Sequence, residues 1–314
     1  MSRATDSTTP VPRCSLLAVA SALAVLVVGV LRPGALLFLS IIMVSVVAHE
    51  AGHFWVARHV GMRPTEFFAG MGPTLWSRRS PRGVDWGVKA FPVGGFVTIP
   101  GMTSSAVVDP ELEPYTYRAA TTWRRLATIL AGPAVNLLIA AGLFALVARI
   151  GYVGSDGTRS GAGLLDAVRF GRDATWGVIT STLWSLGELV MTVPNYVADL
   201  FANTSPDTRF LSPVGATRLT EQAAADDVVT VIAFAAVLNA SLGVFNLLPL
   251  VPLDGGHALI AVTEKGLTVL RRRPVTFDAN RLTPLAVGVI GALVALTATS
   301  LWLDIAHPAA NPFS

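Results

Sequence analysis

The sequence predicts an all-α polytopic membrane protein with about five transmembrane helices and a small membrane-associated β hairpin. Hydrophobic residues make up 52% of the 314 residues, charged residues make up only 14%, and the mean hydropathy is +0.59. Soluble domains carry about 25% charged residues, so this chain has too few charges to cover a water-soluble globule of its size. Several apolar stretches are also long enough to cross about 30 Å of hydrocarbon. A single cysteine, Cys14, excludes an internal disulfide and a cysteine-based zinc site.

The chain contains five apolar stretches that we interpret as spans. The first is followed by Arg32-Pro33-Gly34 and resembles the apolar region of a signal peptide, but a second apolar stretch follows at once. We therefore expect a retained anchor, which places a tail and an extra transmembrane anchor in residues 1–34. The five predicted spans are residues 15–31, 35–57, 126–147, 228–253 and 282–303.

Basic residues assign the sides of the membrane. The net charge is +3, and nearly all of the basic residues are arginines. They gather between spans two and three and between spans four and five, whereas acids outnumber arginines in residues 151–227. Because short cytoplasmic loops carry the excess of Lys and Arg, the two Arg-rich loops and the N-terminus are expected in the cytosol. Residues 151–227 and the C-terminus are then expected outside, and the charge is read as topology rather than as affinity for nucleic acid.

The second predicted span carries the pattern His49-Glu50-Ala51-Gly52-His53. Residues four apart lie on one face of a helix, so His49 and His53 can present two imidazoles to one ion. Two nitrogens and a carboxylate suit zinc and leave a fourth position open, and Glu50 is placed to act as general base. The alternative is a polar cluster that only joins helices by hydrogen bonds. Ionisable groups in an apolar span are costly, which favours the metal site.

Three residues compete for the third ligand position. His59 follows His49 by ten residues, but on an unbroken helix it faces away from His53. Asp254 follows two prolines and precedes Gly255-Gly256, so a broken helix can deliver its carboxylate into the interior. His257 stands beyond the glycine pair and is the less favoured alternative. Asp254 is therefore the preferred ligand, with an ordinary loop aspartate as the other interpretation.

The position of Asp254 also bears on residues 174–193. These residues are apolar enough for a sixth span, but Ser181, Ser185 and Glu188 recur at helical spacing. A sixth span would leave Asp254 on the wrong side of the membrane from His49. We therefore expect an amphipathic helix that lies on the outer surface or packs against the spans.

Several motifs in order resemble the site-2 protease family of intramembrane zinc metalloproteases (peptidase family M50). Within that family the chain is most similar to the actinobacterial Rip-type branch, which is related to the regulator-of-sigma-E protease. The motifs lie within about residues 40–150 and 210–305. They are HEAGH (49–53), GMGPTLWS (70–77), FPVGGFV (91–97), AGPAVN (131–136) and NLLPLVPLDGGH (246–257).

The resemblance implies one zinc ion per chain, held by His49, His53 and Asp254, with Glu50 catalytic. It also implies that Asn246 helps to bind the substrate or the oxyanion. The active site is expected a short way into the membrane from the cytosol. The protease domain would span residues 35–314. Members of this branch usually carry PDZ domains outside the membrane, and residues 151–227 leave no room for one.

Two further segments are candidates for substrate binding. Residues 91–97 are poor in helix formers and can form a hairpin whose edge, near Gly94 and Gly95, pairs with an unwound substrate; a packed cytosolic loop is the alternative. Asn136 either donates hydrogen bonds into the cavity or joins helices as a buried amide.

The sequence thus predicts a zinc-dependent intramembrane endopeptidase in the cell membrane. Its expected substrates are single-span membrane proteins, such as anti-sigma-factor-like proteins or signal-peptide remnants, trimmed first by a site-1-type protease. Membrane lipid is its other expected partner, and no nucleic acid is expected. A multi-span metal-ion transporter that uses the same His and Asp cluster is the alternative, and an inactive zinc-binding scaffold is a third.

Overall fold

The computed structural model describes residues 32–102, 107–151, 160–202, 212–277 and 282–306, together with Ala20, Leu23 and Val27. Apart from those three residues, the predicted first span lies outside the described residues. In chain order the elements are α2 (Pro33–His59), β1 (Glu66–Arg79), β2 (Asp85–Thr98), the short 3-10 helix η1 (Glu113–Tyr115), α3 (Thr122–Ile150), α4 (Leu164–Ala202), α5 (Pro213–Asp226), α6 (Val228–Asn246), α7 (Asp254–Arg271) and α8 (Thr283–Ala306).

Four of the described helices are long and apolar enough to cross a membrane: α2, α3, α6 and α8. They coincide with predicted spans two to five, although α6 ends at Asn246, seven residues earlier than the predicted span. The prediction of a mostly helical, polytopic membrane protein is therefore confirmed.

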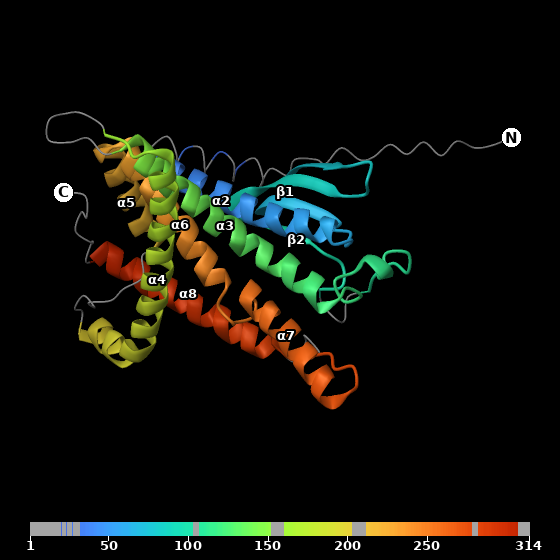
Figure 1. The fold of residues 1–314 in the computed structure, drawn as a ribbon. Coiled ribbons are helices and arrows are strands. Elements are labelled where there is room, and N and C mark those ends of the chain that lie inside the picture. The colour runs from blue at the N-terminus through green and yellow to red at the C-terminus, as the bar shows by residue number, and fades with distance from the viewer. Residues whose placement is uncertain are drawn as a thin grey trace.

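Helix α3 is the centre of the bundle and packs against α2, α4, α6 and α7 (Figure 1). Its contact with α2 is close because small residues face each other. A Cβ atom added at Gly52 of α2 would lie only 2.8 Å from the carbonyl oxygen of Ala131 on α3. Small residues of this kind let membrane helices approach backbone to backbone. The two helices can therefore share one polar site between them.

Helix α4 contains residues 174–193 and differs from its neighbours in direction. Although it has 39 residues, it is not among the helices apolar enough to span a membrane. It packs against α3 and α6, for example where the rings of Phe144 and Phe170 lie 6.5 Å apart. In Figure 1, α4 crosses the bundle rather than running along it. This arrangement agrees with a helix outside the set of spans.

The sheet is larger than the hairpin predicted over residues 91–97. Strands β1 and β2 are long and bent, and they pair with each other in both senses. Residues 66–69 pair in parallel with 85–88 and antiparallel with 95–98, while 76–79 pair antiparallel with 85–88. Residues 95–98 therefore form one outer edge of the sheet, and β2 packs against α2. The bend in β1 follows Gly70 and Gly72, which have the positive φ angles that glycine tolerates best.

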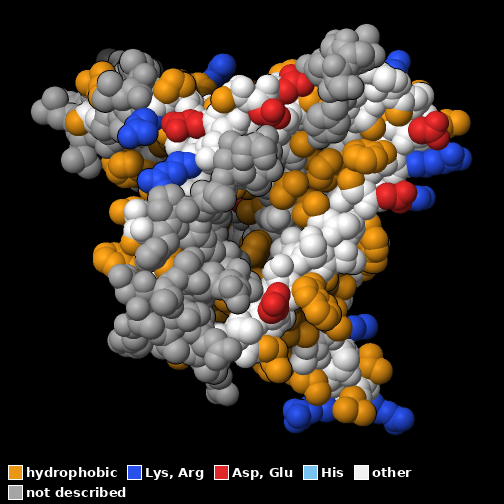
Figure 2. All heavy atoms as spheres, turned by 90° about the vertical axis from the view of Figure 1, so that its left-hand side faces the viewer, with side chains coloured by type: hydrophobic (Ala, Val, Ile, Leu, Met, Phe, Trp, Pro, Cys, Tyr) orange, Lys and Arg blue, Asp and Glu red, His pale blue; other side chains and the backbone are white. Residues whose placement is uncertain are grey.

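The flank of the bundle carries many exposed hydrophobic side chains. On α8 alone, large apolar residues such as Val287, Val294 and Trp302 are more than half exposed. Figure 2 views the molecule from the left-hand side of Figure 1 and shows hydrophobic side chains over its middle, with Lys and Arg toward the margins. Apolar surface of this extent is costly in water and suits a lipid environment.

Candidate metal centre

Helix α2 carries His49, Glu50 and His53 in its second half. His49 and His53 are 6% and 7% exposed, so both imidazoles are buried between α2 and its neighbours. His53 lies six residues before the end of α2, which is about 9 Å along the helix axis. The polar residues therefore lie in the half of the span next to the sheet and the Arg-rich segments.

The third acidic group arrives from a break between two helices. Helix α6 ends at Asn246, the chain turns through residues 247–253, and α7 begins at Asp254. The turn is tight, since a Cβ atom at Gly255 would lie 2.2 Å from the carbonyl oxygen of Leu247. The Gly pair thus allows the chain to fold back so that Asp254 faces α2.

The structure brings His49, His53 and Asp254 together as one cluster. The Nε2 atoms of His49 and His53 lie 3.1 Å apart. Asp254 Oδ2 lies 3.1 Å from the Nε2 of His49 and 3.3 Å from that of His53. Tetrahedral zinc with ligand distances of about 2.0–2.1 Å requires its ligand atoms to be about 3.3 Å apart. The three atoms therefore have the spacing of one face of a zinc tetrahedron, with the fourth position left for a further ligand.

The hydrogen bonding of His53 shows which atom is available to a cation. Its Nδ1 lies 2.8 Å from the backbone carbonyl oxygen of Thr128 on α3. A carbonyl oxygen only accepts, so Nδ1 carries the hydrogen and the Nε2 of neutral His53 presents a lone pair to the cluster. Asp254 Oδ2 is buried and has no hydrogen-bond donor among the described residues. Converging lone pairs repel one another unless a cation lies between them.

Gly132 of α3 provides the space that the cluster needs. A Cβ atom at this position would lie 2.3 Å from the Nε2 of His53 and 2.7 Å from the Nε2 of His49. Any larger residue would occupy the volume in front of both ligand atoms. The donor set, its spacing and this gap fit one zinc ion, held by His49, His53 and Asp254. Zinc, when bound, supplies a Lewis acid that polarises carbonyl groups and activates water.

Glu50 lies between the cluster and the edge of the sheet. A Cβ atom at Gly95 would be 3.5 Å from Cγ of Glu50, and the backbone of Val97 is close enough to interact with its carboxylate. Glu50 is half-buried, unlike the two histidines. Its side chain therefore lies against residues 95–98, which form an outer edge of the sheet.

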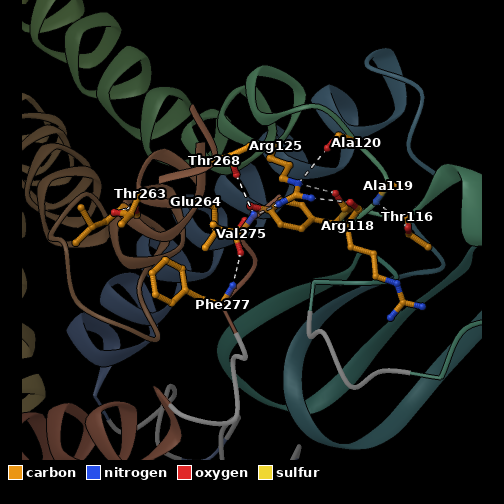
Figure 3. A network of polar contacts seen from close by, with 12 residues as sticks. Thr116, Arg118, Ala119, Ala120, Arg125, Thr263, Glu264, Thr268, Val275 and Phe277 are labelled. Atoms are coloured by element: carbon orange, nitrogen blue, oxygen red, sulfur yellow. Dashed lines mark hydrogen bonds and ion pairs between the residues drawn. The ribbon is translucent and has the colours of Figure 1, made fainter. Parts of the chain in front are cut away.

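A buried ion pair fixes the helix that carries Asp254. Arg125 Nη1 lies 2.9 Å from Glu264 Oε2, and both side chains are less than one-fifth exposed. Arg125 also donates to the carbonyl oxygens of Tyr117, Ala120 and Arg118, as Figure 3 shows in part. The second oxygen of Glu264 accepts the backbone N–H of Phe277. This network joins α7 to the start of α3 and to the segment that precedes it.

Two groups near this network titrate outside their usual ranges. Burial raises the pKa of the Tyr117 phenol, so its ring stays neutral beside the Arg125 guanidinium, 5.3 Å from the ring centroid. Burial also lowers the pKa of His257, which keeps that imidazole neutral near pH 7. Both line a cavity of about 240 Å³ beside α7, together with Arg125 and Glu264.

The structure separates the competing candidates. His59 is exposed and its Nδ1 contacts the carbonyl oxygen of Trp55, away from the cluster. His257 is on α7 but is not among the three residues that group their ligand atoms. Asn246 is the half-buried last residue of α6. Asn136 is fully buried and contacts Nδ1 of His49.

Sequence reasoning missed three contributors on α3 and α7. The carbonyl oxygen of Thr128 carries no side-chain signal, and its role follows only from the packing of α3 on α2. Gly132 belongs to the motif AGPAVN, but only the structure shows why a glycine is needed there, because two imidazoles face it. The Arg125–Glu264 pair joins residues 139 positions apart, so no local pattern indicates it.

The fold and this site together define a class: a polytopic membrane protein with a zinc metallopeptidase site. The model of peptidase family M50 matches residues 37–290, and the chain belongs to that family. The family expected from the motifs is thereby confirmed.

Named relatives agree with this assignment. The zinc metalloprotease Rip1 of Mycolicibacterium smegmatis is 49% identical over 109 residues, which are 34% of this chain and 27% of that protein. The regulator of sigma-E protease RseP of Escherichia coli is 36% identical over 117 residues, which are 37% of this chain and 26% of that protein. The matched segments thus span only about a quarter of these two relatives. A putative zinc metalloprotease of Rhizobium meliloti, R01501, is 24% identical over 85% of this chain and 95% of that protein.

Proposed function

We propose that this protein is a zinc-dependent endopeptidase that cleaves single-span membrane proteins within the bilayer. The observation that carries the proposal is the cluster of His49, His53 and Asp254 inside the apolar bundle, with Glu50 beside it. Three protein ligands at the spacing of a zinc site, next to the carboxylate of Glu50, suit hydrolysis better than structural metal binding. A structural zinc site would be closed by a fourth protein ligand.

Glu50 is the residue that moves the proton. Its carboxylate takes a proton from the attacking water and returns it to the amine that leaves, as general base and then general acid. His49, His53 and Asp254 hold the metal. Asn246, at the break before Asp254, would bind the substrate or its developing oxyanion.

Residues 95–98 supply the surface on which the substrate is held. A transmembrane helix hides its peptide bonds in internal hydrogen bonds, so it must unwind before hydrolysis. Addition of the unwound segment to the outer edge of the sheet would keep it extended. Gly95 lies at this edge beside Glu50, and Gly94 precedes it with a positive φ of 82°. Both are therefore proposed substrate-binding positions.

The distribution of the arginines supports a proposal for the side of the membrane on which the site opens. The sheet, the start of α3 and the end of α7 lie at one end of the bundle in Figure 1, and α5 and the end of α8 lie at the other. The two Arg-rich segments thus share one side, as the positive-inside rule requires. We infer that this side is cytosolic and that the site opens toward it.

The substrates are proposed by class. The name of one relative, the regulator of sigma-E protease RseP, refers to the regulation of sigma-E, so anti-sigma-factor-like proteins are candidates, and signal-peptide remnants are others. An upstream site-1-type protease would trim them first. Residues 1–34 are proposed as a tail and an extra anchor, and residues 35–314 as the protease domain. Residues 151–227 lie on the outer side in this proposal, and α4 and α5 make up their described part.

The test uses the full chain in liposomes with a fluorescently labelled single-span substrate. Native protein is expected to cleave it, Glu50→Gln to lose cleavage while retaining zinc, and His59→Gln to behave as native. His59 is the matched control because it is a histidine of the same helix outside the cluster. Zinc flux that survives in Glu50→Gln would instead indicate a transporter. Zinc binding without cleavage or flux in the native protein would indicate a scaffold.

A further inference from the structure

The buried amide of Asn136 touches a ligand histidine from behind. Asn136 lies on α3 and is completely buried. Its amide nitrogen lies 3.2 Å from Nδ1 of His49, on the side of the ring opposite the cluster. Its oxygen has no hydrogen-bond partner among the described residues.

The amide can face His49 in two ways. A half-turn exchanges its nitrogen and oxygen, so either atom fits the same position. If the nitrogen faces His49, Nδ1 must accept, and the ring hydrogen then sits on Nε2. If the oxygen faces His49, Nδ1 carries the hydrogen and Nε2 presents a lone pair. Each choice leaves one amide atom without a partner, so the amide alone does not decide between them.

The metal-ligand cluster determines which atom of the Asn136 amide faces His49. The Nε2 atom of His49 lies 3.1 Å from both His53 Nε2 and Asp254 Oδ2. A hydrogen on that atom would occupy the space that the metal needs. His53 already has the other arrangement, because its Nδ1 donates to the carbonyl oxygen of Thr128. The same arrangement at His49 makes the two imidazoles equivalent ligands.

We propose that Asn136 is a positioning residue whose side-chain oxygen accepts the Nδ1–H of His49 and so directs the Nε2 lone pair at the metal. The inference rests on the proposed zinc site and adds a residue to it. Ligating histidines generally donate their second nitrogen to such a partner, which fixes the ring and its tautomer. Asn136 is therefore placed behind a ligand, not in contact with the substrate.

The spacing on α3 supports this role. Thr128, Gly132 and Asn136 are four residues apart and lie on one face of the helix. Facing them, α2 presents His53 and His49, also four apart. One face of α3 thus supplies a partner for each imidazole, two turns apart, and Gly132 between the two leaves room for the ligand atoms. The two imidazoles, one turn apart on α2, are thus flanked by partners two turns apart on α3.

The first test measures zinc affinity of the purified full chain by competition with a chromophoric chelator. Asn136→Leu is expected to weaken zinc binding about 10- to 100-fold, the usual effect of removing such a partner. Asn136→Asp keeps an acceptor and is expected to restore most of the affinity. The matched control is Asn239→Leu, which removes another buried amide, one that donates to its own helix at Ala235. It is expected to bind zinc like the native protein.

The second test needs no variant at this position. Nitrogen-15 spectra of histidine-labelled, zinc-loaded native protein in lipid report which ring nitrogen carries hydrogen, and His49→Gln identifies the signal of His49. Hydrogen on Nδ1 supports the proposal. Hydrogen on Nε2, or native zinc affinity in a folded Asn136→Leu, would overturn it while leaving the zinc site in place. Failure of the native protein to hold zinc would overturn the proposed function as well.

Discussion

Replacement of Gly132 by alanine tests whether the gap between α3 and the two imidazoles is required. The added Cβ atom would lie 2.3 Å from the Nε2 of His53 and 2.7 Å from that of His49. Ordinary contacts are about 3.5 Å, so the rings must move by about 1 Å or the helices must separate. Metal ligands tolerate only about 0.2 Å of misplacement. We therefore expect Gly132→Ala to lose zinc.

The size of the effect follows from which contacts are lost. Removal of an outer partner of a ligand weakens metal binding about 10- to 100-fold, and displacement of the ligands themselves should cost at least about 100-fold. Overpacking adds a destabilisation of about 1–3 kcal/mol. The assay is zinc content and affinity after purification in detergent, with thermal unfolding measured on the same samples.

Gly142→Ala is the matched control, because it lies on the same helix and its Cβ atom would meet no other atom within 4 Å. It should keep zinc, and alanine should stabilise the helix by about 0.5–1 kcal/mol. If Gly132→Ala bound zinc as tightly as the native protein, the imidazoles would not face Gly132 as described.

Three further outcomes are expected. Glu264→Ala leaves Arg125 buried without its partner and should destabilise the fold by about 3–5 kcal/mol, whereas the double change Arg125→Met with Glu264→Leu should recover most of that loss in denaturant unfolding. Asp304→Ala removes the acceptor of the Ser212 backbone N–H at the start of α5 and should increase hydrogen exchange in α5 and the end of α8, with unchanged exchange in α5 as the contrary result. Chelation of zinc should lower the melting temperature of the native protein, because zinc present at about 100 times its dissociation constant stabilises the fold by about 2.7 kcal/mol; His49→Ala should show no such shift.

The sequence was most informative where metal-binding residue types recur at the spacing of a helical turn or stand beside residues that break a helix. The spacing of His49 and His53 sets their face on any helix, and Pro and Gly residues before and after Asp254 require a break. These local rules predicted the cluster and the helix that bears it. The positions of four spans followed from hydropathy, because hydrocarbon thickness sets helix length.

The rest depends on contacts between distant segments. The pairing of β1 with β2 in both senses follows from a bend at Gly70 and Gly72, and residues 91–97 alone could indicate only a hairpin. The partner of Arg125 lies 139 residues away, and no local pattern identifies it. The role of Asn136 likewise depends on the crossing of α2 and α3. Periodicity describes faces of single helices, but not which faces meet.

The most direct test of the central claim is the zinc anomalous signal in crystals of the purified full chain. One zinc ion is expected between α2, α3 and α7, with His49, His53 and Asp254 as its protein ligands and Glu50 nearby but not coordinated. A chain without zinc, or zinc bound away from Asp254, would contradict the proposed active site.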